Sequence, residues 1–204
     1  MQQNPVEVSI LSDEKTIISP VESAVSYLIT VPLQIWFIFW LLRRRKIDLS
    51  KNLGLYHFNR NALIYSLVAY LILYLVLTAY SYAFQISPPE EFIKLMQATP
   101  FVLNFLMVVI GAPIVEELLF RGFLFSQLKT TKLGINGSII LTSLIWTSIH
   151  LQYDLFLLIP IFLIGLLLGY LMHKYNSLYL VIIVHAVHNL QATLFIEFFY
   201  DYFY

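Results

Sequence analysis

The sequence predicts an all-α, polytopic membrane protein with about six transmembrane helices and one interfacial helix. Of its 204 residues, 59% are hydrophobic and only 12% are charged. A soluble domain carries about 25% charged residues, so this chain lacks the charges that would cover a soluble globule. Several apolar runs also reach the roughly 18 residues that indicate a transmembrane helix. We therefore expect a single transmembrane domain over residues 1–204, which begins with a polar N-terminal tail at 1–20.

Six apolar segments, separated by polar or charged loops, support the helix count. The predicted spans are residues 21–42, 62–84, 101–128, 137–150, 155–172 and 178–199. The fourth is short for about 30 Å of hydrocarbon at about 1.5 Å per residue, so we expect it to extend past His150 or to lie shielded among its neighbours. Between spans two and three, Phe92, Leu95 and Met96 share a helical face, which predicts a short helix in the membrane interface.

The positions of Lys and Arg predict the orientation of the chain. Nine basic residues lie in the loops after spans one, three and five, against one in the opposite loops. Basic loops remain on the cytoplasmic side, so both termini are expected outside. We therefore expect an integral protein of a bacterial-type plasma membrane, with the lipid bilayer as its surroundings.

Composition removes several functional classes. The chain has no cysteine, which excludes disulfides, thiolate nucleophiles and cysteine-based metal sites. Its formal net charge is zero, so the overall charge gives no indication of nucleic-acid binding, and we expect no nucleic-acid partner. The N-terminus lacks the basic region and cleavage site of a signal peptide.

Span three carries three charged side chains, Glu116, Glu117 and Arg121, near its middle. A charge at the bilayer centre costs about 2.5–3.5 kcal/mol, so all three need partners or a water-filled cavity. Glu117 and Arg121 are four residues apart, about 40° on a helical wheel, and are expected to pair. Glu116 lies about 140° from Arg121 and has no such partner. The sequence therefore singles out Glu116 as a candidate reacting group.

Two other spans present polar pairs at the same i, i+4 spacing. Trp146 and His150 form the pair in span four, and His185 and Asn189 form the pair in span six. One interpretation is that these side chains only hold helices together through hydrogen bonds. The alternative is that both pairs share one site with Glu116.

Three further residues are interpreted as helix packing. Gly165 and Gly169 form a G-x3-G pattern in span five, which predicts the close approach of a neighbouring helix. His188 lies about 300° round the helix from His185 and is expected to pack rather than to react.

Helix arithmetic places the polar residues at similar depths. At about 1.5 Å per residue, Glu116 lies roughly 22 Å from the outer end of span three. On the same basis His185 and Asn189 lie about 10–17 Å from the inner end of span six. We therefore predict one polar, water-accessible cavity formed by spans three, four and six, in which Glu116, His150, His185 and Asn189 lie within about 8 Å of one another.

The three motifs resemble those of the CAAX prenyl protease and bacteriocin-processing family of intramembrane proteases, abbreviated CPBP and also called the Abi family. They read Glu116-Glu117-x3-Arg121, Trp146-x3-His150 and His185-x3-Asn189, in this order over about residues 100–195. The predicted spans are fewer than in the eukaryotic prenyl-protein proteases of that family. A prenylated substrate is therefore not carried over by the resemblance.

The resemblance implies peptide-bond hydrolysis within the membrane, with a peptide or a membrane-associated protein as substrate. Glu116, with His150, would activate a water molecule for attack on the scissile carbonyl. His185 and Asn189 would stabilise the oxyanion.

Three residues are expected to support this chemistry. Glu117 with Arg121 would form a structural ion pair that holds the motif helix. Trp146 would line the substrate groove, and it departs from the family pattern, in which phenylalanine is commoner at this position.

A metal-dependent mechanism remains an alternative. Glu116, His150 and His185 form a His-His-Glu set, which makes a hydrolytic centre when it holds zinc and a water. The family has often been described as metalloproteases. However, the chain has no His-Glu-x-x-His motif. We therefore expect no specific cofactor and slightly favour the metal-free glutamate mechanism.

Two non-enzymatic functions would use the same features. The chain could be a bacteriocin-immunity or scaffold membrane protein that acts by binding, although a binder does not need the intact motif set. It could also be a small transporter whose buried charges mark an ion path. The absence of an inverted repeat argues against transport.

Overall fold

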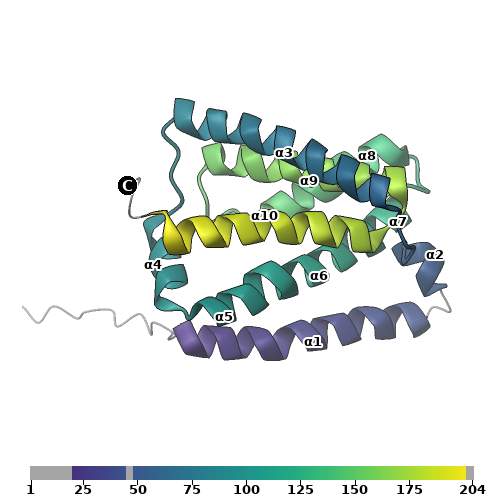
Figure 1. The fold of residues 1–204 in the computed structure, drawn as a ribbon. Coiled ribbons are helices and arrows are strands. Elements are labelled where there is room, and N and C mark those ends of the chain that lie inside the picture. The colour runs from purple at the N-terminus through teal and green to yellow at the C-terminus, as the bar shows by residue number, and fades with distance from the viewer. Residues whose placement is uncertain (1–19, 45–47, 201–204) are drawn as a thin grey trace, which may run out of the picture.

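The computed structural model describes residues 20–44 and 48–200 as a bundle of helices (Figure 1). Residues 1–19 of the predicted polar tail, as well as Arg45 and Lys46 of the first basic loop, lie outside the described residues. The helices are α1 (Pro20–Arg44), α2 (Leu49–Leu53), α3 (Arg60–Ala83), α4 (Glu90–Ala98), α5 (Phe101–Asn104), η1 (Phe105–Gly111), α6 (Ala112–Glu117), η2 (Leu118–Leu124), α7 (Phe125–Leu128), α8 (Gly134–Ser148), α9 (Leu155–Tyr175) and α10 (Leu178–Phe198).

The structure confirms the all-α, polytopic membrane class. In the described part of the chain, five helices are long and apolar enough to span a bilayer: Val25–Arg44, Arg60–Ala83, Phe101–Leu128, Leu155–Tyr175 and Leu178–Phe198. They correspond to the predicted spans one, two, three, five and six.

The predicted fourth span is α8, which has only 15 residues and extends for about 22 Å. The expectation that it continues past His150 is wrong, because the helix ends at Ser148 and a turn follows. One face of α8 packs on α9, whereas Ile140 and Leu144 on another face are exposed. Neighbouring helices therefore cover only one side of α8.

The predicted interfacial helix is α4, which lies across one end of the bundle (Figure 1). Its buried face differs from the expected one. Ile93 and Met96 are buried and Phe92 packs against them, whereas Leu95 is exposed. Asn104 fixes α4 to the start of span three, because its amide donates to the carbonyl oxygens of Met96 and Thr99.

Span three is a composite helix rather than a regular α-helix. Two π-helical segments, η1 and η2, flank the short α6 that ends with Glu117. In a π-helix the backbone hydrogen bonds connect residues five apart, so side chains beyond the segment are rotated relative to their positions on an α-helix. Such segments are frequent at functional sites. Here Glu116 and Glu117 lie between the two segments, and Arg121 lies within η2.

The G-x3-G pattern in α9 brings α8 close, as predicted. A Cβ atom on Gly165 would lie 3.1 Å from Cβ of Ser143 and 3.1 Å from a ring carbon of Trp146. A Cβ atom on Gly169 would lie 3.0 Å from Cγ2 of Ile139. Both glycines therefore allow a helix contact that a larger side chain would push apart.

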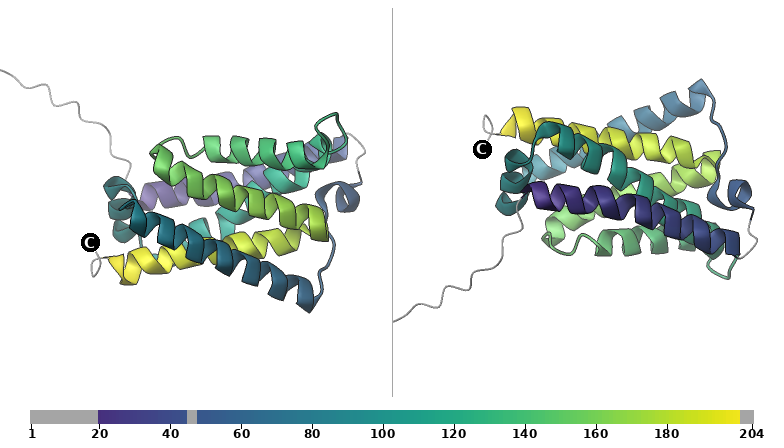
Figure 2. Two further views of the ribbon diagram at one scale, coloured as in Figure 1. Left: turned by 90° about the horizontal axis from the view of Figure 1, so that it is seen from above. Right: turned by 90° about the horizontal axis from the view of Figure 1, so that it is seen from below.

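The two ends of the bundle carry opposite charges. The basic end holds α2, α7 and the α9–α10 turn, and the acidic end holds α4 and the α8–α9 turn (Figures 1 and 2). Basic residues described at the basic end are Arg43, Arg44, Lys51, Arg60, Lys129, Lys132 and Lys174. Charged residues at the acidic end include Glu90, Glu91, Asp154 and Glu197, with Lys94 paired to Glu90 at 2.6 Å.

The segment that follows α2 closes the basic end of the bundle. Leu53 is fully buried. The backbone N–H of Leu178 donates to the carbonyl oxygen of Gly54 at 2.8 Å, and the hydroxyl of Ser177 donates to the carbonyl oxygen of Tyr56 at 2.6 Å. These bonds hold the segment against the two-residue turn between α9 and α10.

Candidate active site

A cavity of about 590 Å³, lined by polar and apolar side chains, lies in the half of the bundle nearer the acidic end. It is called the polar cavity below because it contains the polar residues of the motifs. Its lining includes Glu116, His150, His185 and Asn189, the four side chains that the sequence was expected to bring together. Trp146 also contributes to the wall. More helices line the cavity than expected, because α1, α4 and α9 contribute residues in addition to spans three, four and six.

The predicted pair of Glu117 and Arg121 is formed and completely buried. Nη1 of Arg121 donates to Oε1 of Glu117 at 2.7 Å, and both side chains have 0% exposure. Nη2 of Arg121 donates to the carbonyl oxygen of Gly165 at 3.2 Å, and the guanidinium lies 4.8 Å from the ring centre of Trp146. These contacts connect span three to α9 and α8. A buried charge in low dielectric requires such partners.

Glu117 has a second contact that the sequence did not reveal. Nδ1 of His185 lies 2.8 Å from Oε1 of Glu117. Because a carboxylate accepts, Nδ1 carries the proton and donates. The other ring nitrogen, Nε2, faces Oε2 of Glu116 at 4.0 Å. Glu117 therefore fixes the orientation of the histidine that faces Glu116.

The interpretation of Glu116 as a carboxylate without a partner is wrong. The indole Nε1–H of Trp146, from α8, donates a hydrogen bond to Oε2 of Glu116. The Glu116 side chain is 21% exposed, which leaves it open to the cavity. Trp146 lines the cavity with a side chain that is otherwise buried, and its ring contacts those of His150 and His185. A phenylalanine at this position could not make the bond to Glu116.

His150 does not lie within a helix, as the i, i+4 reasoning assumed, but in the turn after α8. Its Nδ1–H donates to the carbonyl oxygen of Trp146 at 3.0 Å. That carbonyl is among the last four of α8, which have no partner within the helix. Since Nδ1 is used as a donor, the neutral ring keeps Nε2 as an acceptor.

Asn189 uses part of its amide to hold span three. Its Nδ2 donates to the carbonyl oxygen of Val108 in η1 at 2.8 Å. An amide nitrogen has two hydrogens, so one N–H remains for another acceptor. The predicted oxyanion contact is thus limited to that remaining N–H.

The proposed zinc ligands do not form a metal-binding group. Among the described residues, no three His, Asp or Glu side chains lie close enough together to hold a metal ion. Nδ1 of His185 is bonded to Glu117 and Nδ1 of His150 is bonded to a carbonyl oxygen, which leaves both Nε2 atoms free. It is the spacing of the three side chains that does not fit a resident zinc, and no step below passes through a metal.

Sequence reasoning missed Tyr27 as a component of the cavity wall, and it did not connect His188, which was expected to pack, to its partner on α3. Tyr27 belongs to α1, far from the motifs in sequence, and lines the polar cavity beside Glu116. His188 also lines it, and its Nδ1 lies 3.3 Å from the hydroxyl of Tyr70 on α3, which donates to Gln191 at 2.6 Å. No spacing rule connects α1 or α3 to the motif helices, so the sequence carried no signal for either contact.

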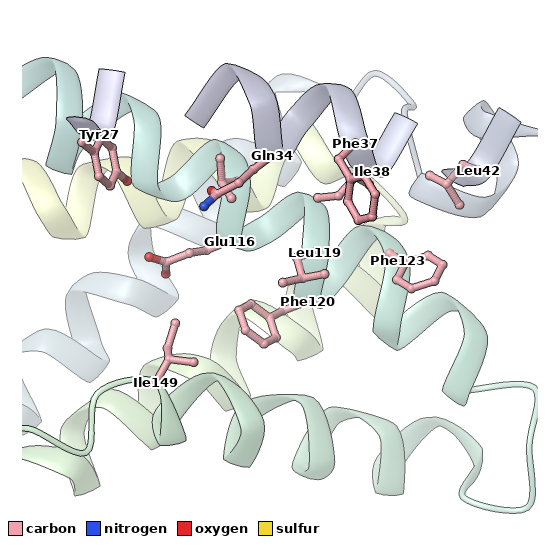
Figure 3. A pocket seen from close by; sticks show the side chains of 11 residues that line it. Tyr27, Gln34, Phe37, Ile38, Leu42, Glu116, Leu119, Phe120, Phe123 and Ile149 are labelled. Atoms are coloured by element: carbon pink, nitrogen blue, oxygen red, sulfur yellow. The ribbon is translucent and has the colours of Figure 1, made fainter. Parts of the chain in front are cut away.

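A second, apolar cavity of about 510 Å³ adjoins Glu116 and runs toward the basic end (Figure 3). It lies between α1 and span three. Figure 3 shows Tyr27 and Glu116 at one end of it, and Leu42 and Phe123 at the other. Gln34 is a further polar group in its wall. Glu116 thus lies where a polar cavity and an apolar cavity meet.

A family model described as "Rce1-like: Type II CAAX prenyl endopeptidase Rce1-like" matches residues 98–191. The match spans the three motifs and the helices that carry them. No curated protein and no solved structure matches the chain.

Proposed function

The chain belongs, through residues 98–191, to the CAAX protease-like family, and on that premise we propose that it is an intramembrane endopeptidase whose reacting centre is Glu116. Its substrate is a peptide or the segment of a membrane-associated protein that enters the polar cavity. The hydrolysis combines one peptide bond with one water and yields a carboxylate and an amine.

The observation that supports this function best is the opposition of Glu116 and His185. Nε2 of His185 faces Oε2 of Glu116 at 4.0 Å, and each group is held by a separate partner, Glu117 for the histidine and Trp146 for the carboxylate. Positioned acid–base groups beside a cavity are what peptide hydrolysis requires. Residues that only pack helices together do not require a histidine nitrogen and a carboxylate oxygen to be held opposite each other.

In the proposed mechanism, Glu116 acts as the general base. It accepts a proton from a water molecule while the water oxygen attacks the scissile carbonyl carbon. In this scheme both ring nitrogens of His185 carry a proton: Nδ1–H donates to Glu117, and Nε2–H donates to the resulting oxyanion. Collapse of the tetrahedral intermediate breaks the C–N bond, and Glu116 returns the proton to the leaving amine.

Two further residues orient the reactants in this scheme. Nε2 of His150 accepts a hydrogen bond from the attacking water, because Nδ1 is occupied by the carbonyl oxygen of Trp146. The remaining N–H of Asn189 supplements His185 at the oxyanion, while its bond to Val108 holds η1.

The direct experiment is peptide cleavage by the purified protein in liposomes. We expect wild type to cleave a membrane-associated peptide and Glu116→Gln to be inactive, although it folds and inserts normally. Glu91→Gln is the matched control, because Glu91 is an exposed carboxylate on α4, outside the cavity lining. Turnover by Glu116→Gln close to that of wild type would disprove the assignment of the base.

A further inference from the structure

The polar cavity has a direction within the bundle. Most of the residues that line it lie in the halves of their helices nearer the acidic end, and His185 and Glu116 lie near the middle. α10 contributes positions from His185 to Ile196 and nothing from its first turns, and α9 contributes positions from Leu157 to Ile164. Phe92 and Met96 of α4 complete the wall at the acidic end. The cavity therefore extends from Glu116 to the acidic end of the bundle.

The corresponding volume at the basic end is filled by side chains. Between the site and the basic loops lie fully or almost fully buried residues: Leu53, Phe125, Leu168, Leu171, Met172, Val181 and Val184. A Cβ atom on Gly122 would lie 3.2 Å from Leu53 and 3.4 Å from Leu178. The segment after α2 is also hydrogen-bonded to the α9–α10 turn. Water therefore has no open route through this packed region.

Polar groups follow the route from Glu116 to the acidic end. Gln152 and Tyr153, in the turn after α8, line the cavity near α4. Burial raises the pKa of Tyr153, so its hydroxyl stays protonated and can donate. Thr193 borders the same cavity, and its buried hydroxyl has no hydrogen-bond partner among the described residues. Gln152 and the Tyr153 hydroxyl, which are hydrogen-bonded to each other, are the polar groups that a peptide backbone would meet on this route.

The geometry points to substrate entry from the extracytoplasmic side of the membrane. We infer that the peptide segment cleaved by this protein lies on the outer face, as in an exported peptide or an outer juxtamembrane segment. The inference rests on the proposed function and on the orientation expected from the basic loops, which makes the acidic end the outer one.

The apolar cavity offers a different route, from the basic end or the lipid. It reaches Leu42 and Phe123 and is lined by aliphatic and aromatic side chains apart from Tyr27, Gln34 and Glu116. Such walls do not stabilise a file of water molecules or a peptide backbone. An experiment can distinguish the polar cavity from the apolar cavity as the route of entry, because each cavity has lining residues that the other lacks.

The absence of native cysteine makes a direct test possible, since any introduced cysteine is the only thiol. Ala112→Cys and Ala192→Cys place a small thiol in the wall of the polar cavity at two heights. Glu91→Cys marks the acidic end, Thr131→Cys marks the basic end, and Phe123→Cys marks the apolar cavity. A charged, membrane-impermeant thiol reagent is added to intact cells or to inside-out vesicles.

We expect both cavity variants to be labelled from the outside together with Glu91→Cys, whereas Thr131→Cys is labelled only in inside-out vesicles. Two results would overturn the inference. One is labelling of Ala112→Cys and Ala192→Cys only from the side that labels Thr131→Cys. The other is labelling of Phe123→Cys and Ala112→Cys from the cytoplasmic side, which would make the apolar cavity the route.

The same labelling is repeated in the Glu116→Gln background, in which no cleavage is expected. Accessibility does not depend on turnover, so a failure of the proposed function leaves this result intact. Conversely, an active protease whose cavity cysteines are labelled only from inside would retain the function and remove the outer route.

Discussion

Oε1 of Glu117 lies 2.8 Å from Nδ1 of His185, although 68 positions of sequence separate the two residues. The same oxygen accepts from Arg121 at 2.7 Å. One buried carboxylate thus stabilises a buried guanidinium and orients the histidine that faces Glu116. Its structural and functional roles can be separated by mutation.

Glu117→Ala should lower both stability and activity. It leaves Arg121 buried without its carboxylate, which costs about 3–5 kcal/mol in soluble proteins. It also removes the acceptor that holds His185. Thermal unfolding in detergent and peptide turnover measure the two losses.

Replacing Glu117 and Arg121 together with Leu and Met should recover part of the stability and none of the activity. An apolar pair of similar volume needs no charge partner, but it cannot orient His185. If the double variant is no more stable than the worse single variant, the two residues are not coupled. If it regains turnover, Glu117 has no role in positioning His185.

Trp146→Phe should reduce kcat while the fold is retained. The substitution keeps an aromatic ring in the buried site and removes only the indole N–H that donates to Glu116. A hydrogen bond to a charged group contributes about 1.5–3 kcal/mol, so the loss of kcat is on the order of ten- to a hundredfold. Trp36→Phe, on an exposed surface of α1, is the control and should leave kcat unchanged. Equal kcat values for both variants would show that the bond to Glu116 is not used in the reaction.

Metal chelation should leave peptide cleavage unchanged. In the part of the chain that the structure describes, no three His, Asp or Glu side chains lie close enough together to hold a metal ion. Turnover is measured before and after treatment with a strong zinc chelator, and metal content is determined by elemental analysis. Stoichiometric zinc in the active protein, with loss of turnover on removal and recovery on addition, would contradict the metal-free mechanism.

Much of the fold and part of the site follow from local rules of sequence. Hydrophobic length predicts the spans, and the i, i+4 rule predicts the pair of Glu117 and Arg121, because both properties depend on neighbours along one helix. The hydrogen bond from Trp146 to Glu116 depends on how α8 packs on span three. A helical wheel of span three contains only residues of that span, so it shows Glu116 without a partner.

Helix irregularities account for other differences from the sequence-based expectation. The π-helical segments η1 and η2 rotate side chains by amounts that a regular 3.6-residue wheel does not contain. His150 lies beyond the end of α8, where its side chain donates to a carbonyl oxygen that has no partner within the helix. The direction of its side chain therefore cannot be predicted from a helical wheel of span four. Tyr27 lies on a helix outside the motifs, and only the packing of α1 brings it beside Glu116.

Gly165→Ala should lower both stability and activity, whereas Gly169→Ala should lower stability alone. Both glycines lie on the face of α9 that packs on α8, and an added Cβ atom would meet α8 at 3.1 Å and 3.0 Å respectively. At Gly165 one of the neighbours is the Trp146 ring, and the carbonyl oxygen of Gly165 also accepts from Arg121. A displaced Trp146 loses its bond to Glu116, so kcat should fall.

At Gly169 the neighbour is Ile139, one helical turn nearer the basic end and outside the cavity lining. Overpacking of this kind typically costs about 1–3 kcal/mol, so the two variants should show similar losses of thermal stability. Turnover is then compared at a temperature where both remain folded. A fall in kcat for Gly165→Ala only would connect the packing of α9 on α8 to the position of Trp146. Equal falls would show that turnover depends on the general tightness of this helix pair rather than on the Trp146 contact.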